Sequence, residues 1–214
     1  DSALNHLVIG NPAVDGVTWT AHSAAEDRDN WNSITYGNGL FVAVGDTYSG
    51  CCSYNSLMTS PDGITWTARS VAGDDDGWNS ITYGNGLFVA VGYDDDRVMT
   101  SPDGITWTPR SAAGDNDSWS GVTYGNGLFV AVAYGASGDH VMTSSDGITW
   151  TARTAAGDDD SWFDITYGNG LFVAVGDTQG TTTDAVMTSP DGITWTSRSA
   201  AGYNDSWGSV TYVN

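Results

Sequence analysis

The sequence predicts an all-β fold, a five-bladed β-propeller of four-stranded antiparallel blades, from three observations. A segment Asp-Gly-(Ile/Val)-Thr-Trp occurs five times, with its tryptophan at Trp19, Trp66, Trp107, Trp150 and Trp195. A second tryptophan, which follows an aspartate by two residues, recurs in step with the first, at Trp31, Trp78, Trp119, Trp162 and Trp207. Both series advance by 47, 41, 43 and 45 residues, a period typical of propellers and other repeat arrays, and no stretch of the chain shows helical spacing.

One unit, taken from residue 78 to residue 118, predicts four strands in order. Residues 79–83 alternate small polar with β-branched or aromatic residues, and 84–86 is a Gly-Asn-Gly hairpin turn. Residues 87–91 are continuously apolar and too short for a helix, as expected of a strand covered on both faces. A third strand is expected at 98–101, and a fourth is expected to begin at 105–108 after an Asp-Gly turn.

The whole chain, residues 1–214, is expected to form one domain. An open stack of its blades would leave two unpaired strand edges. The repeat units are expected at about 31–77, 78–118, 119–161, 162–206, and at 207–214 combined with 1–30. We therefore expect a ring closed by pairing of the N- and C-terminal strands, with Gly208–Tyr212 as an inner strand. Residues 4–9 would supply either the second or the third strand of this closing blade, and both alternatives stay open.

The composition excludes two classes of partner. The formal charge is −20, with no lysine, six arginines, and Glu26 as the only glutamate. Nucleic acid requires clustered basic residues, so it is not expected as a partner, and an anionic membrane surface would repel the chain. No apolar run approaches the roughly 18 residues of a membrane span, so no membrane insertion is expected. Solvation and the binding of a ligand or ion both account for the acidity.

Compartment and redox state are less constrained by the sequence. The N-terminus shows no basic segment followed by an apolar core, so no signal peptide is expected, although a processed chain would look the same. An extracellular or virion-surface location is favoured over others. Cys51 and Cys52 are adjacent, so they are either free thiols or a vicinal disulfide.

The segment from Ser60 to Trp66, Ser-Pro-Asp-Gly-Ile-Thr-Trp, resembles the Asp-box of bacterial neuraminidase-like repeats, with one residue fewer between Asp and Gly. Similar turns lie at Ser101–Trp107, Ser144–Trp150 and Ser189–Trp195, with a degraded copy at Val14–Trp19. The resemblance implies a structural role in which the Asp caps the turn and the Trp packs into the blade. In blade number and near-identical repeats the chain is also similar to tachylectin-like animal lectins, which implies one amino-sugar site per blade.

An enzyme is not expected, because chemically suitable residues are distributed one per unit. The sialidase pattern implied by the Asp-box resemblance needs three converging arginines and a tyrosine paired with Glu, whereas the repeated arginines occupy equivalent positions in separate units: Arg69, Arg110, Arg153 and Arg198. His6, His22 and His140 share no ligand spacing, so neither a zinc site nor a Ser-His-Asp arrangement is predicted. The repeated methionines are expected to fill the core: Met58, Met99, Met142 and Met187.

The loop between successive units is the predicted ligand site, because a carboxylate that accepts two hydroxyl protons beside an indole that stacks on a sugar ring suits carbohydrate. The candidate contacts are Asp29, Trp31, Asp76, Trp78, Asp117, Trp119, Asp160, Trp162, Asp205 and Trp207. The alternative is that each Trp wedges between blades while each Asp caps a strand or pairs with an Arg. No cofactor is expected. Calcium held by the Asp-x-Asp carboxylates stays open, although the motif lacks the downstream Glu of a calcium loop.

The sequence thus favours a monomeric, non-catalytic recognition module that binds carbohydrate multivalently, with up to one site per blade and glycans or a surface macromolecule as partners. The alternative is a structural, adhesion or protein-interaction scaffold domain of a larger surface or virion protein, or a domain without an evolved ligand. Loops that vary in length between units would then contact one macromolecular partner; they are 46–57, 92–97, 134–140 and 176–185.

Overall fold

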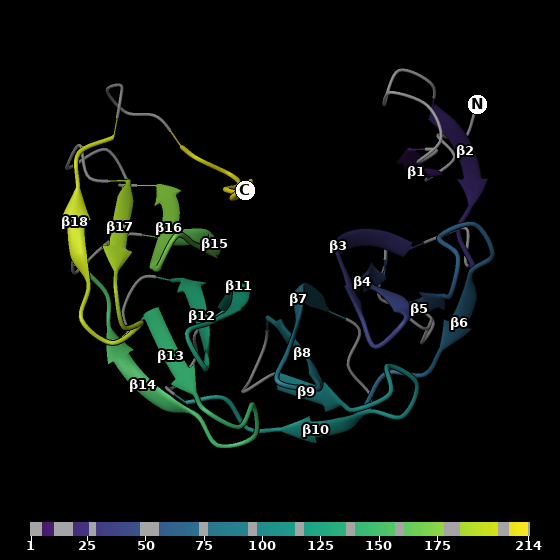
Figure 1. The fold of residues 1–214 in the computed structure, drawn as a ribbon, viewed down its shortest axis with the longest axis horizontal. Coiled ribbons are helices and arrows are strands. Elements are labelled where there is room, and N and C mark those ends of the chain that lie inside the picture. Colours follow the sequence, from purple (N-terminus) through teal and green to yellow (C-terminus); the bar gives the residue numbers. More distant parts are fainter. Residues whose placement is uncertain are drawn as a thin grey trace.

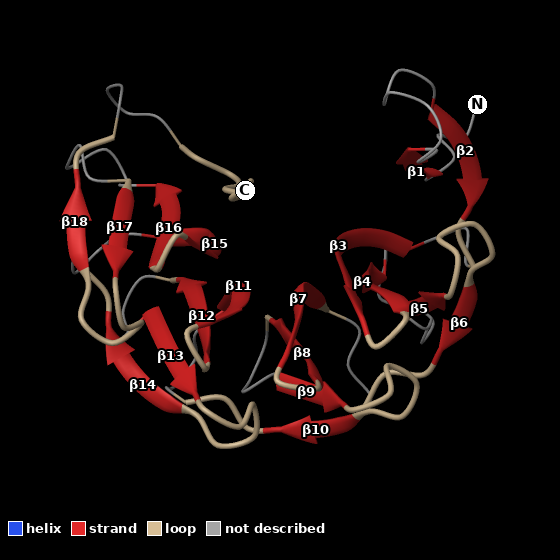
Figure 2. Cartoon of the chain, viewed as in Figure 1, coloured by secondary structure: helices blue, strands red, loops and turns tan. Residues whose placement is uncertain are grey.

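The computed structural model describes residues 6–10, 19–25, 29–47, 56–72, 77–93, 98–113, 118–135, 140–156, 161–177, 185–200 and 206–213. Every regular element in these ranges is a β-strand, and none is a helix (Figure 2). The described residues accordingly include no helix able to span a membrane. The all-β class predicted from the sequence is confirmed.

Four four-stranded antiparallel sheets make up most of the molecule, and we call them blades 1 to 4. Blade 1 contains β3 (Asp29–Gly37), β4 (Leu40–Thr47), β5 (Leu57–Ser60) and β6 (Thr67–Arg69). Blade 2 contains β7 (Trp78–Gly84), β8 (Leu87–Gly92), β9 (Val98–Ser101) and β10 (Thr108–Arg110). Blade 3 contains β11 (Ser118–Gly125), β12 (Leu128–Tyr134), β13 (His140–Ser144) and β14 (Thr151–Thr154). Blade 4 contains β15 (Ser161–Gly168), β16 (Leu171–Asp177), β17 (Val186–Ser189) and β18 (Thr196–Arg198).

The blades stand side by side along an open arc (Figure 1). The first strands β3, β7, β11 and β15 lie on the concave side, next to one another, and the fourth strands form the convex rim. Within each blade the strands follow chain order, first to fourth. The predicted four-stranded meander is therefore confirmed for four units.

The hairpin between the first and second strands has the geometry that its residues favour. Asn85 and Gly86 both have positive φ, 49° and 77°, as a type I′ turn requires, and this turn matches the twist of the flanking strands. The fourth strand begins later than predicted: β10 starts at Thr108, and Ile105 and Thr106 still belong to the preceding turn.

The Asp-Gly turn before each fourth strand is held by one carboxylate oxygen. Asp62 Oδ1 accepts hydrogen bonds from the amides of Ile64 and Thr65, each at 2.8 Å, and from the Ser60 hydroxyl at 2.9 Å. The Trp66 indole donates to the carbonyl of Gly63 at 3.2 Å. The carboxylate bonds recur around Asp103, Asp146 and Asp191, so the structural role expected of these residues is confirmed in four turns.

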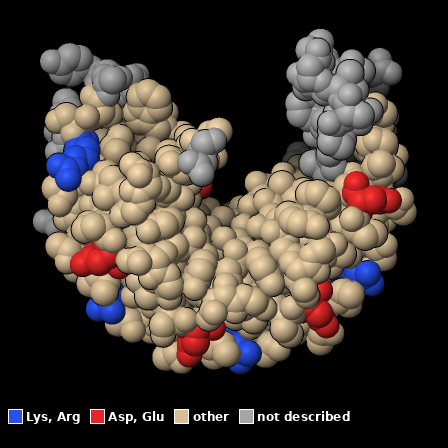
Figure 3. Space-filling view, in the orientation of Figure 1, with Lys and Arg blue, Asp and Glu red and all other residues tan. Residues whose placement is uncertain are grey.

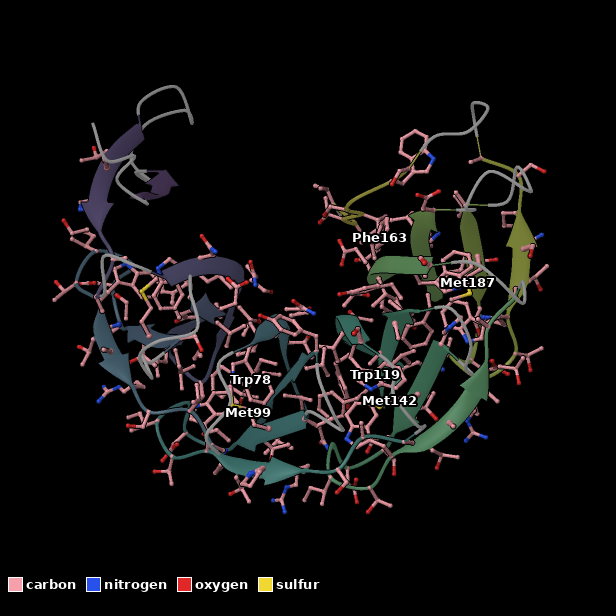
Figure 4. The ribbon with its side chains drawn as sticks, turned by 180° about the vertical axis from the view of Figure 1, so that it is seen from behind. Trp78, Met99, Trp119, Met142, Phe163 and Met187 are labelled. Carbon is pink, nitrogen blue, oxygen red and sulfur yellow. The ribbon has the colours of Figure 1, made fainter. Side chains whose placement is uncertain are left out.

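The tryptophan at the start of each first strand is a wedge between two blades. Trp78 is 2% exposed and packs with Val44 and Leu57 of blade 1 and with Phe88 of its own blade. Trp119 and Trp162 are equally buried at the next two interfaces, and Figure 4 shows Trp78 and Trp119 inside the arc. The repeated methionines are fully buried farther out in the blades, as predicted.

A tyrosine–glycine contact completes each interface. The ring of Tyr124 in blade 3 lies on Gly84 of blade 2, so close that a Cβ at residue 84 would overlap it. The same contact recurs with Tyr83 on Gly37 and Tyr167 on Gly125. The first strands therefore need a residue without a side chain at this place.

Ring closure and a fifth blade are not confirmed. β1 (His6–Gly10) and β2 (Trp19–Ser23) form a separate two-stranded sheet at one end of the arc, and residues 206–213 lie at the other end (Figure 1). Residues 206–213 contain no strand. They are held instead on blade 4, where the Trp207 amide donates to the Gly176 carbonyl at 3.0 Å.

The pairing of β1 indicates which strand the N-terminal segment resembles. β1 pairs antiparallel with β2, with Ile9 opposite Thr20 and Val8 opposite Ala21. In blade 1 the third strand β5 pairs antiparallel with the fourth strand β6. Because β2 follows the Asp-Gly segment as a fourth strand does, its partner β1 takes the position of a third strand.

Replacing Gly84 with Ala should lower the free energy of unfolding by about 1–3 kcal/mol, because the added methyl overlaps the Tyr124 ring. Urea denaturation would measure this. The matched control is Tyr124→Ala, in whose background Gly84→Ala should cost much less. Equal costs in both backgrounds would contradict the contact.

Stability should fall as the pH drops from about 4 to about 2. The pKa of Asp62 is lowered to about 2 by the amide hydrogen bonds of Thr65 and Ile64 and the Ser60 hydroxyl, and the same bonds lower the pKa values of Asp103, Asp146 and Asp191. A depressed pKa contributes stability that is present above the unfolded value, near 3.9, and is lost as pH falls through the folded value. Urea titrations across this range should show a flatter profile when all four are replaced with Asn, which keeps an acceptor oxygen. Parallel profiles would refute the assignment.

Candidate functional site: the central channel

The predicted loop sites, one per blade, are described only in part. Asp76, Asp117, Asp160 and Asp205 lie outside the described residues, as do Cys51 and Cys52 and most of the variable loops, and only the backbone of Asp29 is described. Of the indoles, those of blades 2 to 4 are buried, the one in blade 1 is half-buried, and the last is 38% exposed; they are Trp78, Trp119, Trp162, Trp31 and Trp207. A fully buried ring presents no face to a sugar, which favours the packing alternative for the three buried indoles.

A β-bulge follows the tryptophan in every first strand. The register shifts between Trp31 and Ser33, and again after Trp78, Trp119 and Trp162. A bulge turns one side chain out of the regular alternation, and bulges are common beside functional sites. The four bulged residues are Asn32, Asn79, Ser120 and Phe163, and all four line one cavity on the concave side of the arc.

This cavity, which we call the channel cavity, has a volume of about 450 Å³, within the range of small-molecule sites. Its wall contains residues of all four blades and of the C-terminal segment 206–213. The polar part of the wall, as far as the structure describes it, is made of amides, hydroxyls and one carboxylate, Asp164, with no basic side chain. Its aromatic groups are Phe163 and the partly buried Trp31.

The bulged residues also join neighbouring blades. Asn32 Nδ2 donates to the carbonyl of Trp78 at 3.0 Å, and Asn79 Nδ2 donates to the carbonyl of Trp119 at 3.0 Å. The Ser120 hydroxyl makes the equivalent bond to the carbonyl of Trp162. Each amide uses one N–H in this way and keeps a second N–H and its carbonyl oxygen for another partner.

A second set of bonds comes from the next residue along the first strands of blades 1, 2 and 4, whereas blade 3 has Gly121 at this place. The hydroxyls of Ser33 and Ser80 accept from the amides of Ile81 and Val122, at 3.2 and 3.1 Å. Blade 4 has Asp164 at this place. Its Oδ2 accepts from the amide of Val210 at 2.9 Å and from the Ser209 hydroxyl at 2.8 Å, which ties the C-terminal segment to the arc.

Asp164 and Phe163 make blade 4 different from the others. Asp164 Oδ1 accepts from the Ile165 amide at 2.8 Å, so each oxygen of this carboxylate is used and each retains capacity for a further hydrogen. Phe163 cannot form the inter-blade bond of its counterparts. Its ring packs edge-on against Tyr134, with centroids 6.4 Å apart, and Figure 4 shows it on the concave side of the arc.

Sequence reasoning missed this site although the repeats contain a signal for it. The first strands are nearly identical except for the two residues after the tryptophan, which read Asn-Ser, Asn-Ser, Ser-Gly, Phe-Asp and Gly-Ser. Variation concentrated at two positions of a repeated frame marks residues that the fold does not fix. The bulge that turns these residues into one cavity was not predicted from the sequence.

Charged groups lie mainly away from the channel cavity. Figure 3 shows acidic and basic side chains along the convex rim. The arginines donate through Nε to threonine hydroxyls of the neighbouring third strand, as Arg110 does to Thr100 at 3.0 Å. Within the described ranges no three His, Cys, Asp or Glu side chains gather as a metal site, and the predicted Asp-x-Asp pairs fall mostly outside those ranges.

The fold is that of known β-propellers. The chain is similar to a catalytically inactive variant of virginiamycin B lyase from Staphylococcus aureus with quinupristin, at a TM-score of 0.66 and 10% identity, covering 92% of this chain and 59% of that one. It is also similar to two computationally designed proteins, Ika8 (TM-score 0.56, 14% identity, 86% of this chain and 53% of that one) and Ika4 (TM-score 0.54, 11% identity, 78% and 94%). No protein-family model and no curated protein matches the chain.

The lyase corrects the expectation that the chain is not an enzyme. That expectation rested on the argument that repeated blades cannot bring unlike catalytic groups together, and an enzyme has this fold. The channel cavity supplies a physical reason why that argument fails. Its residues differ from blade to blade, so chemically unlike groups from separate blades face one cavity. At 10% identity the likeness concerns the fold alone, and the chain spans 59% of the lyase's length.

Replacing Asn79 with Ala should lower the free energy of unfolding by about 0.5–1.5 kcal/mol, because the Trp119 carbonyl loses its donor. Replacing it with Ser should cost less, because Ser120 makes the equivalent bond in blade 3. Chemical denaturation of both variants would measure the difference. If Ala and Ser are equally destabilising, the side chain does not join the blades through this bond.

Proposed function

We propose that this protein is a carbohydrate-recognition module that binds a small neutral sugar in the channel cavity. The observation that supports the proposal is the wall of the channel cavity, in which the bulged residues and the residues that follow them supply amides, hydroxyls, a carboxylate and an aromatic ring around one space of about 450 Å³. Sugars are recognised by such planar polar groups together with a ring that packs on their C–H faces.

The charge of the site selects among sugars. Among the described residues, Asp164 is the one charged residue in the cavity wall, and the whole chain has a formal charge of −20. An anionic sugar would be repelled by both, whereas hydroxyl groups can donate to the remaining lone pairs of Asp164 and to the amide oxygens of Asn32 and Asn79. The proposed ligand is therefore a neutral sugar, or one with an amino group.

The number of sites proposed differs from the number expected from the repeats. Because the cavity wall takes different residues from each blade, the proposal is one site per chain in place of one per blade. We further propose that the ligand-bound form is a five-bladed ring, completed by β1, β2 and residues 206–213. The pairing of β1 with β2 and the hydrogen bond from the Val210 amide to Asp164 support this.

A protein-interaction scaffold is the second candidate. It is favoured by the inter-blade bonds of Asn32, Asn79 and Ser120, since residues that join blades have a structural use without any ligand. Under this alternative the channel is a packed interface and partners contact the rim or the loops.

Replacing Phe163 with Ala should weaken binding of the sugar by about tenfold, because the ring supplies the apolar surface of the wall. A glycan array of neutral sugars would select the ligand, and titration calorimetry would measure affinity and stoichiometry. Ile105→Ala is the matched control, since Ile105 is 46% exposed on the far turn and should leave affinity unchanged. Several equal sites per chain, or unchanged affinity in Phe163→Ala, would contradict the proposed site. If no sugar on the array binds, the scaffold is favoured.

A further inference from the structure

We propose that the sugar site extends from the channel cavity to the ring of Tyr134, which forms a second subsite, so that the preferred ligand is an oligosaccharide of at least two neutral rings. This second subsite rests on the proposed function, because it enlarges the same site and names the class of sugar that the site takes. The feature that supports it is a pair of aromatic side chains at the junction of blades 3 and 4.

The Tyr134 ring of blade 3 contacts the Phe163 ring of blade 4. The ring centroids are 6.4 Å apart and the planes are inclined by 62°, so the pair is edge-to-face. Phe163 belongs to the wall of the channel cavity and lies on the concave side of the arc (Figure 4). Two aromatic surfaces therefore follow one another, the first in the cavity wall and the second beside it, at a spacing comparable to that of linked sugar rings.

Tyr134 stays open to solvent in spite of this contact. Its side chain is 42% exposed, and in an edge-to-face pair neither ring covers both faces of the other. An exposed tyrosine can pack its ring on the C–H face of a sugar, and its hydroxyl can donate to or accept from a sugar hydroxyl. The exposed part of Tyr134 therefore suits a second sugar ring.

The strand pairing places Tyr134 at the same end of the blades as the channel cavity. Tyr134 is the last residue of β12 and pairs with Ser118, the first residue of β11. Ser120 of the cavity wall lies two residues farther along β11, and Phe163 is the third residue of β15. A ligand in the cavity would thus have Tyr134 beside it, at the end of the blades opposite the Gly-Asn-Gly hairpins.

The equivalent tyrosine of blade 2 shows why Tyr134 takes this position. Tyr93 also follows the second strand, and its ring lies on Gly77 of its own blade, so close that a Cβ at residue 77 would overlap it. Blade 3 has Ser118 in place of Gly77, and a side chain there fills the space that the ring would need. Tyr134 contacts Phe163 of the next blade instead.

The aromatic pair depends on residues that are not repeated. Among the four bulged residues only Phe163 is aromatic, and the place of Tyr134 is taken by an aspartate in blades 1 and 4. The repeated frame therefore provides this combination at the junction of blades 3 and 4, which agrees with one site per chain. It also gives the ligand a direction, from the cavity past Phe163 to Tyr134.

The test is titration calorimetry of the whole chain with glucose, galactose, mannose and N-acetylglucosamine, and with the linear disaccharides of each. The disaccharide of a sugar that binds should bind about tenfold more tightly than the monosaccharide. Tyr134→Leu keeps an apolar contact with Phe163 but has no flat ring, so it should reduce this ratio to about twofold or less. Tyr134→Phe restores the ring and should retain most of the ratio.

The readout is the ratio of the two affinities, because a variant that only disturbs Phe163 lowers both together. Tyr93→Leu is the matched control, since the Tyr93 ring is packed on Gly77 and its loss should leave the ratio as it is. An unchanged ratio in Tyr134→Leu, or an equal fall in Tyr93→Leu, would overturn the second subsite. Monosaccharide binding with no gain for any disaccharide would reject the subsite and leave the proposed function standing, whereas binding of none of these sugars would reject both.

Discussion

The wedge formed by the tryptophan of each first strand is the interaction on which the rest of the structure depends. Trp78, Trp119 and Trp162 each fill the space between two blades, and each is at most 2% exposed. Indole rings of this size bury a large apolar area, and the cost of removing one is several kcal/mol. Because a blade shares its tryptophan with its neighbour, no blade can bury its core alone, and the repeat must be stacked to be stable.

Packing at the wedge explains why the channel is polar. The large apolar side chains are buried between the blades. The bulged residues beside each tryptophan face the concave side, and their amides and hydroxyls join one blade to the next. The first strands are not paired by backbone ladders between blades, so Asn32, Asn79 and Ser120 supply the directional bonds. Under the proposed function these residues would have a structural role and a recognition role, and variants that keep the inter-blade bond, such as Asn79→Ser, separate the two.

The two ends of the arc show what happens when a wedge has one neighbour only. Among the described residues, Trp31 has no preceding four-stranded blade and is partly buried, and Trp207 has no second strand of its own unit and is 38% exposed. In the proposed closed ring, the contact between the two ends would also differ from the others. Gly208 has no side chain to donate to the Trp31 carbonyl, and Val213 stands where the other first strands have glycine.

The sequence by itself determined the strand class, the repeat, the type I′ turns and the capping role of residues such as Asp62, because these depend on neighbours within a few positions of the chain. It also marked Met99 and its counterparts as core. Only the tertiary structure decided that Trp78 is buried and that Asn79 and Phe163 share a cavity. It decided too that β1 pairs with β2, in the position of a third strand. These features depend on contacts between residues about 40 positions apart and on a bulge that reverses the side-chain alternation. They therefore cannot be predicted from the residue pattern of one strand.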